Sequence, residues 1–114
     1  MKTIESAFQE LFTTFLKKEE YSATFVDMIQ HCNRVIQLEL PITLQDGSYQ
    51  RIRAIRVQHN NWNGPYKGGL RFAKDANEEE CRGLAIIMTL KCILLNIPFG
   101  GGKGAICILS LIHI

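Results

Sequence analysis

The stretch that decides the fold runs from Gly64 to Ala105 and reads GPYKGGLRFAKDANEEECRGLAIIMTLKCILLNIPFGGGKGA. It contains two glycine-rich segments, each with one lysine, and between them a helical pattern that carries a third lysine in its most apolar part. Glycine lets a backbone approach a ligand closely, and lysine supplies a mobile cationic donor. We therefore expect a pocket for a small anionic substrate here, with the rest of the chain as its scaffold.

The segment between the glycine-rich parts predicts one long helix. Asp75 or Asn77 can cap its N-terminus, and the glutamates at 78–80 suit the positive end of the helix dipole. The helical pattern continues to about Asn96, and Pro98 ends it.

Lys91 is the most informative single residue of this helix. From Leu84 to Leu95 the pattern is apolar on every side except at Thr89 and Lys91, and such a helix is normally buried. A buried ammonium group needs a partner. Alternatively, Lys91 reaches solvent along its own aliphatic stem.

The glycine-rich segments predict two turns. Lys67 precedes Gly68 and Gly69, and Lys103 precedes Gly104, so a P-loop, which needs Ser or Thr after its lysine, does not fit. No GxGxxG dinucleotide fingerprint fits these glycines either. Taken alone, each lysine is usually a solvated residue. If the three lysines converge, two can bind carboxylates while the third acts as a general base or activates water.

Upstream of this stretch the sequence predicts two helices. Apolar residues at spacings of three and four predict an amphipathic helix over 2–18 and a shorter one over 22–32. Ser22 suits the N-cap of the second helix. Both helices have the character of packing or subunit-contact elements rather than catalytic ones.

A hairpin follows the two helices. Alternation over 35–44 predicts a half-buried strand, in which Pro41 indicates an edge or a bulge. Asp46-Gly47 predicts the hairpin turn, and the return strand spans about 49–59. The apolar pattern of the return strand slips in phase, which predicts a bulge near Ala54.

Two further strands are expected, a short one around 70–72 and a buried one over 105–114. With the helices and the hairpin they predict an α/β fold in one layered domain. The 114 residues are enough for a real hydrophobic core.

Composition excludes several classes of function. A net charge of +2 is too small to imply a nucleic-acid or membrane partner. We see no secretion signal and no apolar run of roughly 20 residues, so we expect a cytoplasmic protein. The scattered histidines give no metal site. The four cysteines, none at CxxC spacing, predict free thiols in a reduced compartment: Cys32, Cys81, Cys92 and Cys107.

Four blocks of sequence occur in a distinctive order and spacing: RVQHN at 56–60, GPYKGGLRF at 64–72, MTLK at 88–91 and PFGGGKG at 98–104. They resemble the glutamate dehydrogenases, within the wider family of glutamate, leucine, phenylalanine and valine dehydrogenases. The similarity covers about 35–105, and the two leading helices also suit that family. The resemblance implies a mixed sheet with flanking helices, like the N-terminal dimerisation and substrate domain of these enzymes.

The resemblance also implies a reaction, the oxidative deamination of L-glutamate to 2-oxoglutarate and ammonia, with NAD or NADP accepting the hydride. By position, Lys103 resembles the catalytic lysine that activates water for attack on the imino carbon. Lys67 resembles the lysine that binds the side-chain carboxylate of the substrate, and Lys91 the one that binds its α-carboxylate. The sequence does not decide between NAD and NADP.

The remaining implied site residues are Gly68 and Gly69, which would line the substrate, and Met88, which would contact its chain one helical turn before Lys91. Lys67 also bears on the choice of substrate. Relatives that act on leucine, valine or phenylalanine bind an apolar side chain, which would leave this lysine unpaired. Glutamate is therefore favoured, and a related dehydrogenase with another amino-acid substrate is the alternative.

The match to the family weakens after Lys103. Family members continue with roughly Gly-Gly-Ile and a further helix, whereas this chain reads AICILSLIHI over 105–114. The family's catalytic aspartate and Rossmann domain would lie downstream. We therefore expect 1–114 to form an incomplete N-terminal domain. The segment 107–114 is either native or a tail produced by truncation or a shifted reading frame.

Three hypotheses about the role of the chain follow. It is a fragment of a glutamate dehydrogenase that is inactive by itself, in a family whose full-length members form homo-oligomers, hexamers by resemblance. Alternatively, it is a non-catalytic oligomerisation module. As a third hypothesis, the three lysines still form a binding site for dicarboxylates.

Overall fold

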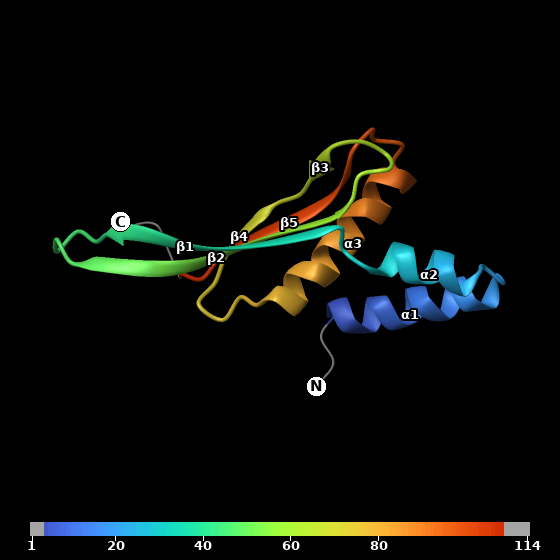
Figure 1. Ribbon diagram of the computed structural model, residues 1–114, viewed down its shortest axis with the longest axis horizontal. Coiled ribbons are helices and arrows are strands. Elements are labelled where there is room, and N and C mark those ends of the chain that lie inside the picture. The colour runs from blue at the N-terminus through green and yellow to red at the C-terminus, as the bar shows by residue number, and fades with distance from the viewer. Residues whose placement is uncertain (1–3, 109–114) are drawn as a thin grey trace.

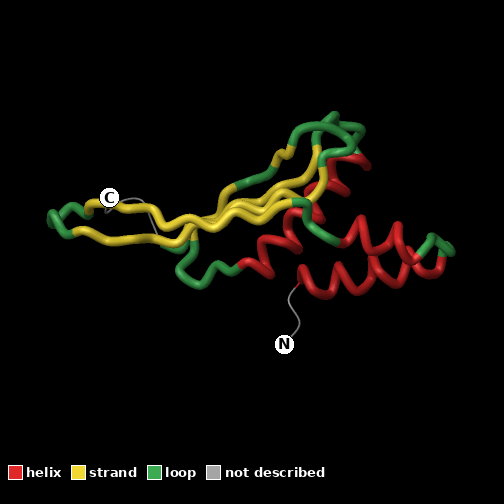
Figure 2. Tube along the Cα trace, in the orientation of Figure 1, coloured by secondary structure: helices red, strands yellow, loops and turns green. Residues whose placement is uncertain are grey.

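A computed structural model describes residues 4–108 and shows an elongated α/β molecule with extents of 58 × 34 × 22 Å (Figure 1). One helix lies on a mixed sheet, and the two N-terminal helices lie side by side next to that helix, beyond the end of the sheet (Figure 2). In chain order the elements are α1 (Ile4–Lys18), α2 (Ala23–Gln30), β1 (Arg34–Thr43), β2 (Tyr49–Asn60), β3 (Tyr66–Lys67), β4 (Leu70–Phe72), α3 (Glu78–Leu94) and β5 (Gly100–Ile106). The predicted fold class is confirmed.

The sheet has the strand order β1-β2-β5-β3, with β4 also paired to β5. β1 and β2 form an antiparallel hairpin, β2 and β5 are antiparallel, and β3 and β4 run parallel to β5. Tyr66 lies opposite Gly100 and Leu70 lies opposite Gly104, so β3 and β4 keep one register. They are therefore two halves of one strand, interrupted at 68–69.

Both helix caps that the sequence predicted are present. The hydroxyl of Ser22 accepts a hydrogen bond from the backbone N–H of Phe25 at 3.1 Å. Asn77, rather than Asp75, caps α3 and accepts from the backbone N–H of Glu80 at 2.9 Å. Each side chain replaces a hydrogen-bond partner that the first turn of a helix lacks.

The hairpin confirms one prediction and corrects another. Pro41 lies on β1, which forms one edge of the sheet within the described residues. The bulge predicted near Ala54 is wrong, because the ladder between β1 and β2 has no register shift. The apolar pattern changes phase because Ala54 lies on one face of β2 while Ile55 and Val57 lie on the face that α3 covers. A register shift occurs instead at 58–60, on the side of β5.

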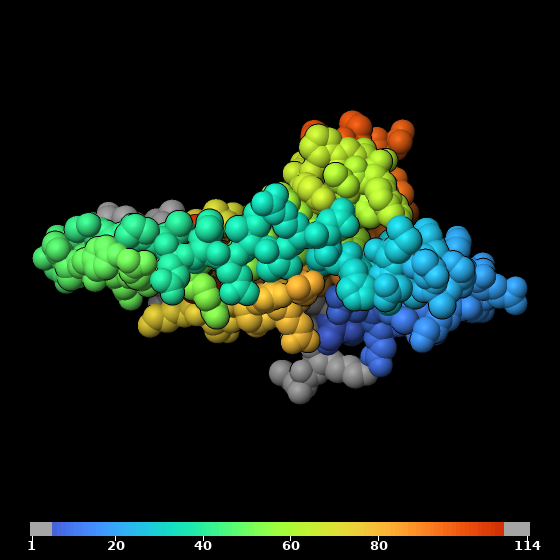
Figure 3. All heavy atoms as spheres, in the orientation of Figure 1, coloured from blue at the N-terminus to red at the C-terminus, as the bar shows by residue number. Residues whose placement is uncertain are grey.

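The distal part of this hairpin extends beyond the rest of the sheet. β5 pairs with β2 only from Ala54 to Asn60, so the residues at 49–53 have no neighbour in β5. The hairpin projects from the body of the molecule as a narrow arm (Figure 3).

The second glycine-rich segment was predicted to be a turn, and that prediction is wrong. The segment forms the central strand β5. Its glycines provide space. A Cβ at Gly101 would collide with Oγ1 of Thr89 and the carbonyl oxygen of Ala85 on α3, and a Cβ at Gly100 would collide with the carbonyl oxygen of Asn60. Glycine thus lets α3 and β2 lie directly against this strand.

The strand predicted over 105–114 begins earlier and is shorter than expected. β5 begins at Gly100, and of the residues predicted for this strand it contains Ala105 and Ile106, while Cys107 and Ile108 form a bend. The rest of that prediction, at 109–114, lies outside the described residues. None of the described helices is both long and apolar enough to cross a bilayer.

The hydrophobic core lies between α3 and the sheet. α3 packs on β2 and β5, and α1 packs on α3. Residues from β2, α3, β5 and the turn before α3 share this core: Ile55, Val57, Ala76, Cys81, Ala85 and Ala105. All four cysteines are free thiols, as predicted, and two of them are buried in α3.

Candidate active site

Lys67 and Lys103 lie on neighbouring strands and on the same face of the sheet. Lys67 pairs with Gly101, and Lys103 lies two residues further along β5. Alternate residues of a strand share a face. A Cβ at Gly101 would touch Thr89 of α3, and Ala105 belongs to the core under α3. Both lysines therefore lie on the face that α3 covers.

Gly68 and Gly69 have different roles between these lysines. A Cβ at Gly68 would collide with the carbonyl oxygen of Gly102, so a side chain there would push the strands apart. A Cβ at Gly69 would lie 3.1 Å from Nζ of Lys103. The carbonyl of Gly69 also accepts the backbone N–H of Gly104 at 2.9 Å. Glycine at 69 therefore leaves space beside the ammonium group of Lys103.

Met88 and Lys91 lie on the flank of α3 that faces β4. An ion pair between Arg71 of β4 and Glu80 of α3 marks this flank. Spacings of eight and eleven residues lead from Glu80 to Met88 and Lys91, which keeps all three on one stripe of the helix. Met88 is half-buried and Lys91 is exposed.

The structure thus places the three predicted lysines on one side of the sheet, on β3, β5 and α3. Lys103 is half-buried, and Lys67 is exposed. The ammonium group of Lys103 also acts on the thiol of Cys81, whose pKa burial raises and Lys103 lowers in part. The arrangement gives one sheltered cation and two accessible ones.

The prediction that α3 is buried around Lys91 holds for one side of the helix only, where Thr89 and Cys92 are 2% and 0% exposed. The end of the helix is apolar but open, with Ile93, Leu94 and Leu95 exposed to 51%, 83% and 68%. Lys91 therefore reaches solvent directly, which is the alternative that the sequence left open.

His59 is a residue of this region that the sequence showed only as part of a matching block. Its imidazole is 1% exposed, with Nδ1 2.6 Å from Oγ1 of Thr89 and Nε2 2.6 Å from the carbonyl oxygen of Ile29. Burial lowers the pKa of His59, and the hydrogen bond to Ile29 raises it in part. The alternation of His59 with Ile55 and Val57 was the signal of an inward position.

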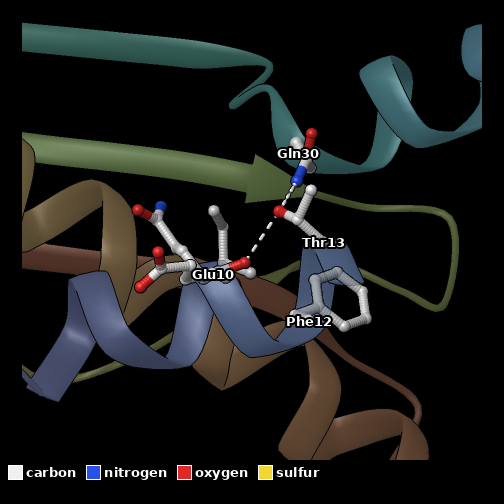
Figure 4. Close-up of a pocket in the computed structure, with 6 residues that line it drawn as sticks. Glu10, Phe12, Thr13 and Gln30 are labelled. Carbon is white, nitrogen blue, oxygen red and sulfur yellow. Dashed lines mark hydrogen bonds between the residues drawn. The ribbon is translucent and has the colours of Figure 1, made fainter. Parts of the chain in front are cut away.

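A separate cavity of about 220 Å³ lies where α1, α2 and α3 meet, and Figure 4 shows Gln30 and Thr13 pointing toward one another across it. It is lined by Gln9, Glu10, Phe12, Thr13, Gln30 and Ile86. Ile86 precedes Met88 by two positions, so the two side chains lie on nearly opposite sides of α3. This cavity is therefore not part of the lysine site.

Many curated proteins and solved structures resemble this chain, and the following are two of each. The NAD-specific glutamate dehydrogenase of Staphylococcus aureus (strain COL) is 40% identical over 98 residues, which are 86% of this chain and 24% of that protein. The catabolic NAD-specific glutamate dehydrogenase of Bacillus subtilis (strain 168) is 39% identical over 98 residues, 86% of this chain and 23% of that protein. The chain therefore spans about a quarter of the length of these relatives.

The solved glutamate dehydrogenase of Peptoniphilus asaccharolyticus superposes with a TM-score of 0.84 at 33% identity, over 91% of this chain and 26% of that one. The hetero-hexameric glutamate dehydrogenase of Thermus thermophilus, in its Leu-bound form, gives 0.80 at 28% identity, over 92% and 26%. Residues 32–110 match the family model described as Glu/Leu/Phe/Val dehydrogenase, dimerisation domain. This chain therefore belongs to the Glu/Leu/Phe/Val dehydrogenase family.

Proposed function

We propose that this chain forms the substrate-binding part of a glutamate dehydrogenase, which converts L-glutamate to 2-oxoglutarate and ammonia. The observation that carries the proposal is the placement of Lys67, Lys91 and Lys103 on one side of the sheet. Glutamate has two carboxylates, and two accessible ammonium groups can bind them while a third group serves the chemistry.

Each lysine has a distinct role in this proposal. The exposed Lys67 binds the side-chain carboxylate of the substrate, and the exposed Lys91 binds its α-carboxylate. Met88 contacts the aliphatic chain between them, and Gly69 leaves space for the substrate beside Lys103. Lys103, the sheltered cation, activates the water that attacks the imino carbon. A partly buried amine next to other cations is suited to proton transfer.

NAD is the hydride acceptor in this proposal, because two of the relatives are named as NAD-specific. The sequence contains no GxGxxG segment, so the chain contributes the substrate side of the site. We propose accordingly that 1–114 forms an incomplete N-terminal domain and is inactive by itself. The free thiols support a cytoplasmic location.

The test is a chimera in which 4–106 of this chain replace the matching segment of the Staphylococcus aureus enzyme. We expect glutamate-dependent reduction of NAD, which Lys103→Ala abolishes and which Lys67→Ala weakens mainly through KM. The 114-residue chain alone should produce no reduced nicotinamide. A chimera that assembles correctly but shows no glutamate-dependent activity would contradict the proposal.

A second candidate function is an oligomerisation module, which the description of the matching family model as a dimerisation domain favours. In the full-length protein we propose a homo-oligomer, a hexamer by resemblance. The hetero-hexameric Thermus thermophilus relative supports assembly into a hexamer but does not bear on whether the subunits are identical. Sedimentation of the chain tests the module: a defined oligomer supports it, whereas a monomer or a polydisperse aggregate counts against it.

A further inference from the structure

We infer that His59 is a positioning residue: through Thr89 it fixes how α3 lies on β5, and with it the placement of Met88 and Lys91 relative to Lys103. The inference rests on the proposed function, because it concerns the same site. His59 itself is fully buried and is assigned no contact with substrate.

One imidazole joins three elements of the fold. His59 belongs to β2, its Nε2 lies 2.6 Å from the carbonyl oxygen of Ile29 near the end of α2, and its Nδ1 lies 2.6 Å from Oγ1 of Thr89 in α3. A carbonyl can only accept, so Nε2 carries the proton. In a neutral ring Nδ1 is then an acceptor. The hydroxyl of Thr89 donates to it at 2.6 Å in preference to the carbonyl oxygen of Ala85, which lies 3.3 Å from the hydroxyl oxygen. Burial favours this neutral form.

Thr89 is also the point at which α3 touches the central strand. Its side chain is 2% exposed, and a Cβ at Gly101 would collide with both its hydroxyl and its backbone nitrogen. Two neighbouring contacts of α3 repeat this closeness: Ala85 also lies against Gly101, and Sγ of Cys92 lies 3.9 Å from the carbonyl oxygen of Gly100. The hydroxyl that His59 holds therefore lies at the closest approach of the two elements.

The hydrogen bond between His59 and Thr89 fixes the position of α3 on β5, which apolar packing alone would leave adjustable. Small residues such as Ala85 and Gly101 let a helix approach a strand. They do not prevent the helix from sliding slightly along the strand or rotating slightly about its own axis. A short bond between a buried ring and a buried hydroxyl has a preferred length and direction. Thr89 lies one residue after Met88 and two before Lys91, so a shift of this turn moves both site residues.

Two pairs of variants of the 114-residue chain separate the two contacts of His59. His59→Asn keeps an acceptor near Nδ1 for Thr89 but loses the donor to Ile29. His59→Gln keeps a donor near Nε2 for Ile29 but loses the acceptor for Thr89. Thr89→Val removes the hydroxyl at nearly constant shape, and Thr89→Ser keeps it.

The readout is the NMR signal of ¹³C-methyl-labelled methionines together with titration by 2-oxoglutarate. Met88 reports on the site, and Met28 reports on α2. We expect Thr89→Val and His59→Gln to move the Met88 signal and to weaken binding about tenfold, the effect of an unsatisfied buried group. Thr89→Ser and His59→Asn should leave the Met88 signal and the affinity nearly unchanged, although His59→Asn should move Met28.

If His59 has a purely structural role, all four variants should move the signals of Met88 and Met28 alike. That result would overturn the inference, and so would a Met88 signal that does not respond to Thr89→Val. If His59→Gln does not fold, Thr89→Val decides alone, because it changes one hydroxyl. If the unaltered chain does not bind 2-oxoglutarate, the dicarboxylate site fails in this chain, and the Met88 signal still decides the role of His59.

Discussion

At 64–69 the chain turns into the sheet, whereas at 100–104 an equally glycine-rich segment runs straight through its middle. Gly64 has a φ of 144°, a conformation that other residues rarely adopt. Gly101 has no such φ, and its hydrogen takes the place of a side chain that would strike α3. Conformation therefore requires glycine only in the first segment, at Gly64, whereas close backbone packing requires it in both, at Gly68 against Gly102 and at Gly101 against α3. The two causes predict different sensitivities to substitution.

The largest effect should come from Gly101→Ala in β5. Its new methyl group would meet the backbone of Ala85 and Thr89, which cannot move without displacing α3. We expect a loss of about 3 kcal/mol in the free energy of unfolding, measured by urea denaturation.

The matched control lies one residue away in the same strand. A Cβ at Gly102 would lie 3.2 Å from both the guanidinium of Arg56 and the carbonyl oxygen of Val57. Part of this contact is a flexible side chain, so we expect Gly102→Ala to cost about 1 kcal/mol. Equal losses for the two variants would refute the idea that contact with α3 makes Gly101 special.

Mild acid should destabilise the fold without any substitution, through the buried His59 that bonds Thr89 of α3. The pKa of buried His59 lies below its ordinary value of 6.5, so the unfolded chain binds a proton more readily than the folded one. The contribution of neutral His59 to the free energy of unfolding is therefore fully present above about pH 6.5. It declines as the pH falls from there toward the pKa of His59 in the folded state.

Urea unfolding between pH 7 and 5 measures this decline, which we expect to be smaller than the loss from Gly101→Ala. The pKa of Glu78 is lowered from 4.5 by its hydrogen bond to Arg82, so that carboxyl titrates below this range. His59→Asn is the control and should flatten the profile. An unchanged pH profile in that variant would assign the decline to another group.

Gly47→Ala isolates the conformational role of glycine. Gly47 has a φ of 82° in the hairpin turn, and a Cβ there would meet no atom within 4 Å. Any loss therefore comes from the backbone alone, and we expect about 1 kcal/mol by thermal or urea unfolding. A larger loss would mean that the turn has contacts beyond its conformation.

The smallest effect on stability should come from Gly69→Ala, since the nearest atom to a Cβ there is the mobile Nζ of Lys103 at 3.1 Å. We expect a change below about 0.5 kcal/mol. In the chimera, however, displacing this ammonium group by a few tenths of an ångström should lower kcat about tenfold. Normal activity of the variant would argue against a reacting atom beside Gly69.

Periodicity predicted the helices and the hairpin because their apolar residues repeat at 3.6 or at 2 positions. It located only the end of β5, at 105–106, because the glycines at 100–104 have no apolar pattern that marks them as a strand. The structure shows why this segment is a strand: glycine at 101 leaves room for the backbone of α3. For the site, the sequence indicated the lysines, and the resemblance already implied Gly69. The structure adds that a Cβ at Gly69 would lie 3.1 Å from Nζ of Lys103. The contact between His59 and Thr89 joins residues 30 positions apart, which no local pattern reveals.

The position of β5 has a consequence for how the chain folds. It is the last strand of the described residues, yet it lies at the centre of the sheet between β2 and the β3–β4 strand. During synthesis the hairpin and α3 emerge first and wait, with their inner apolar surfaces open, until about the hundredth residue has left the ribosome. Such late, non-local closure slows folding and prolongs exposure to aggregation. Chaperones that shield nascent chains are thus expected to matter most just before the GGGKG segment appears.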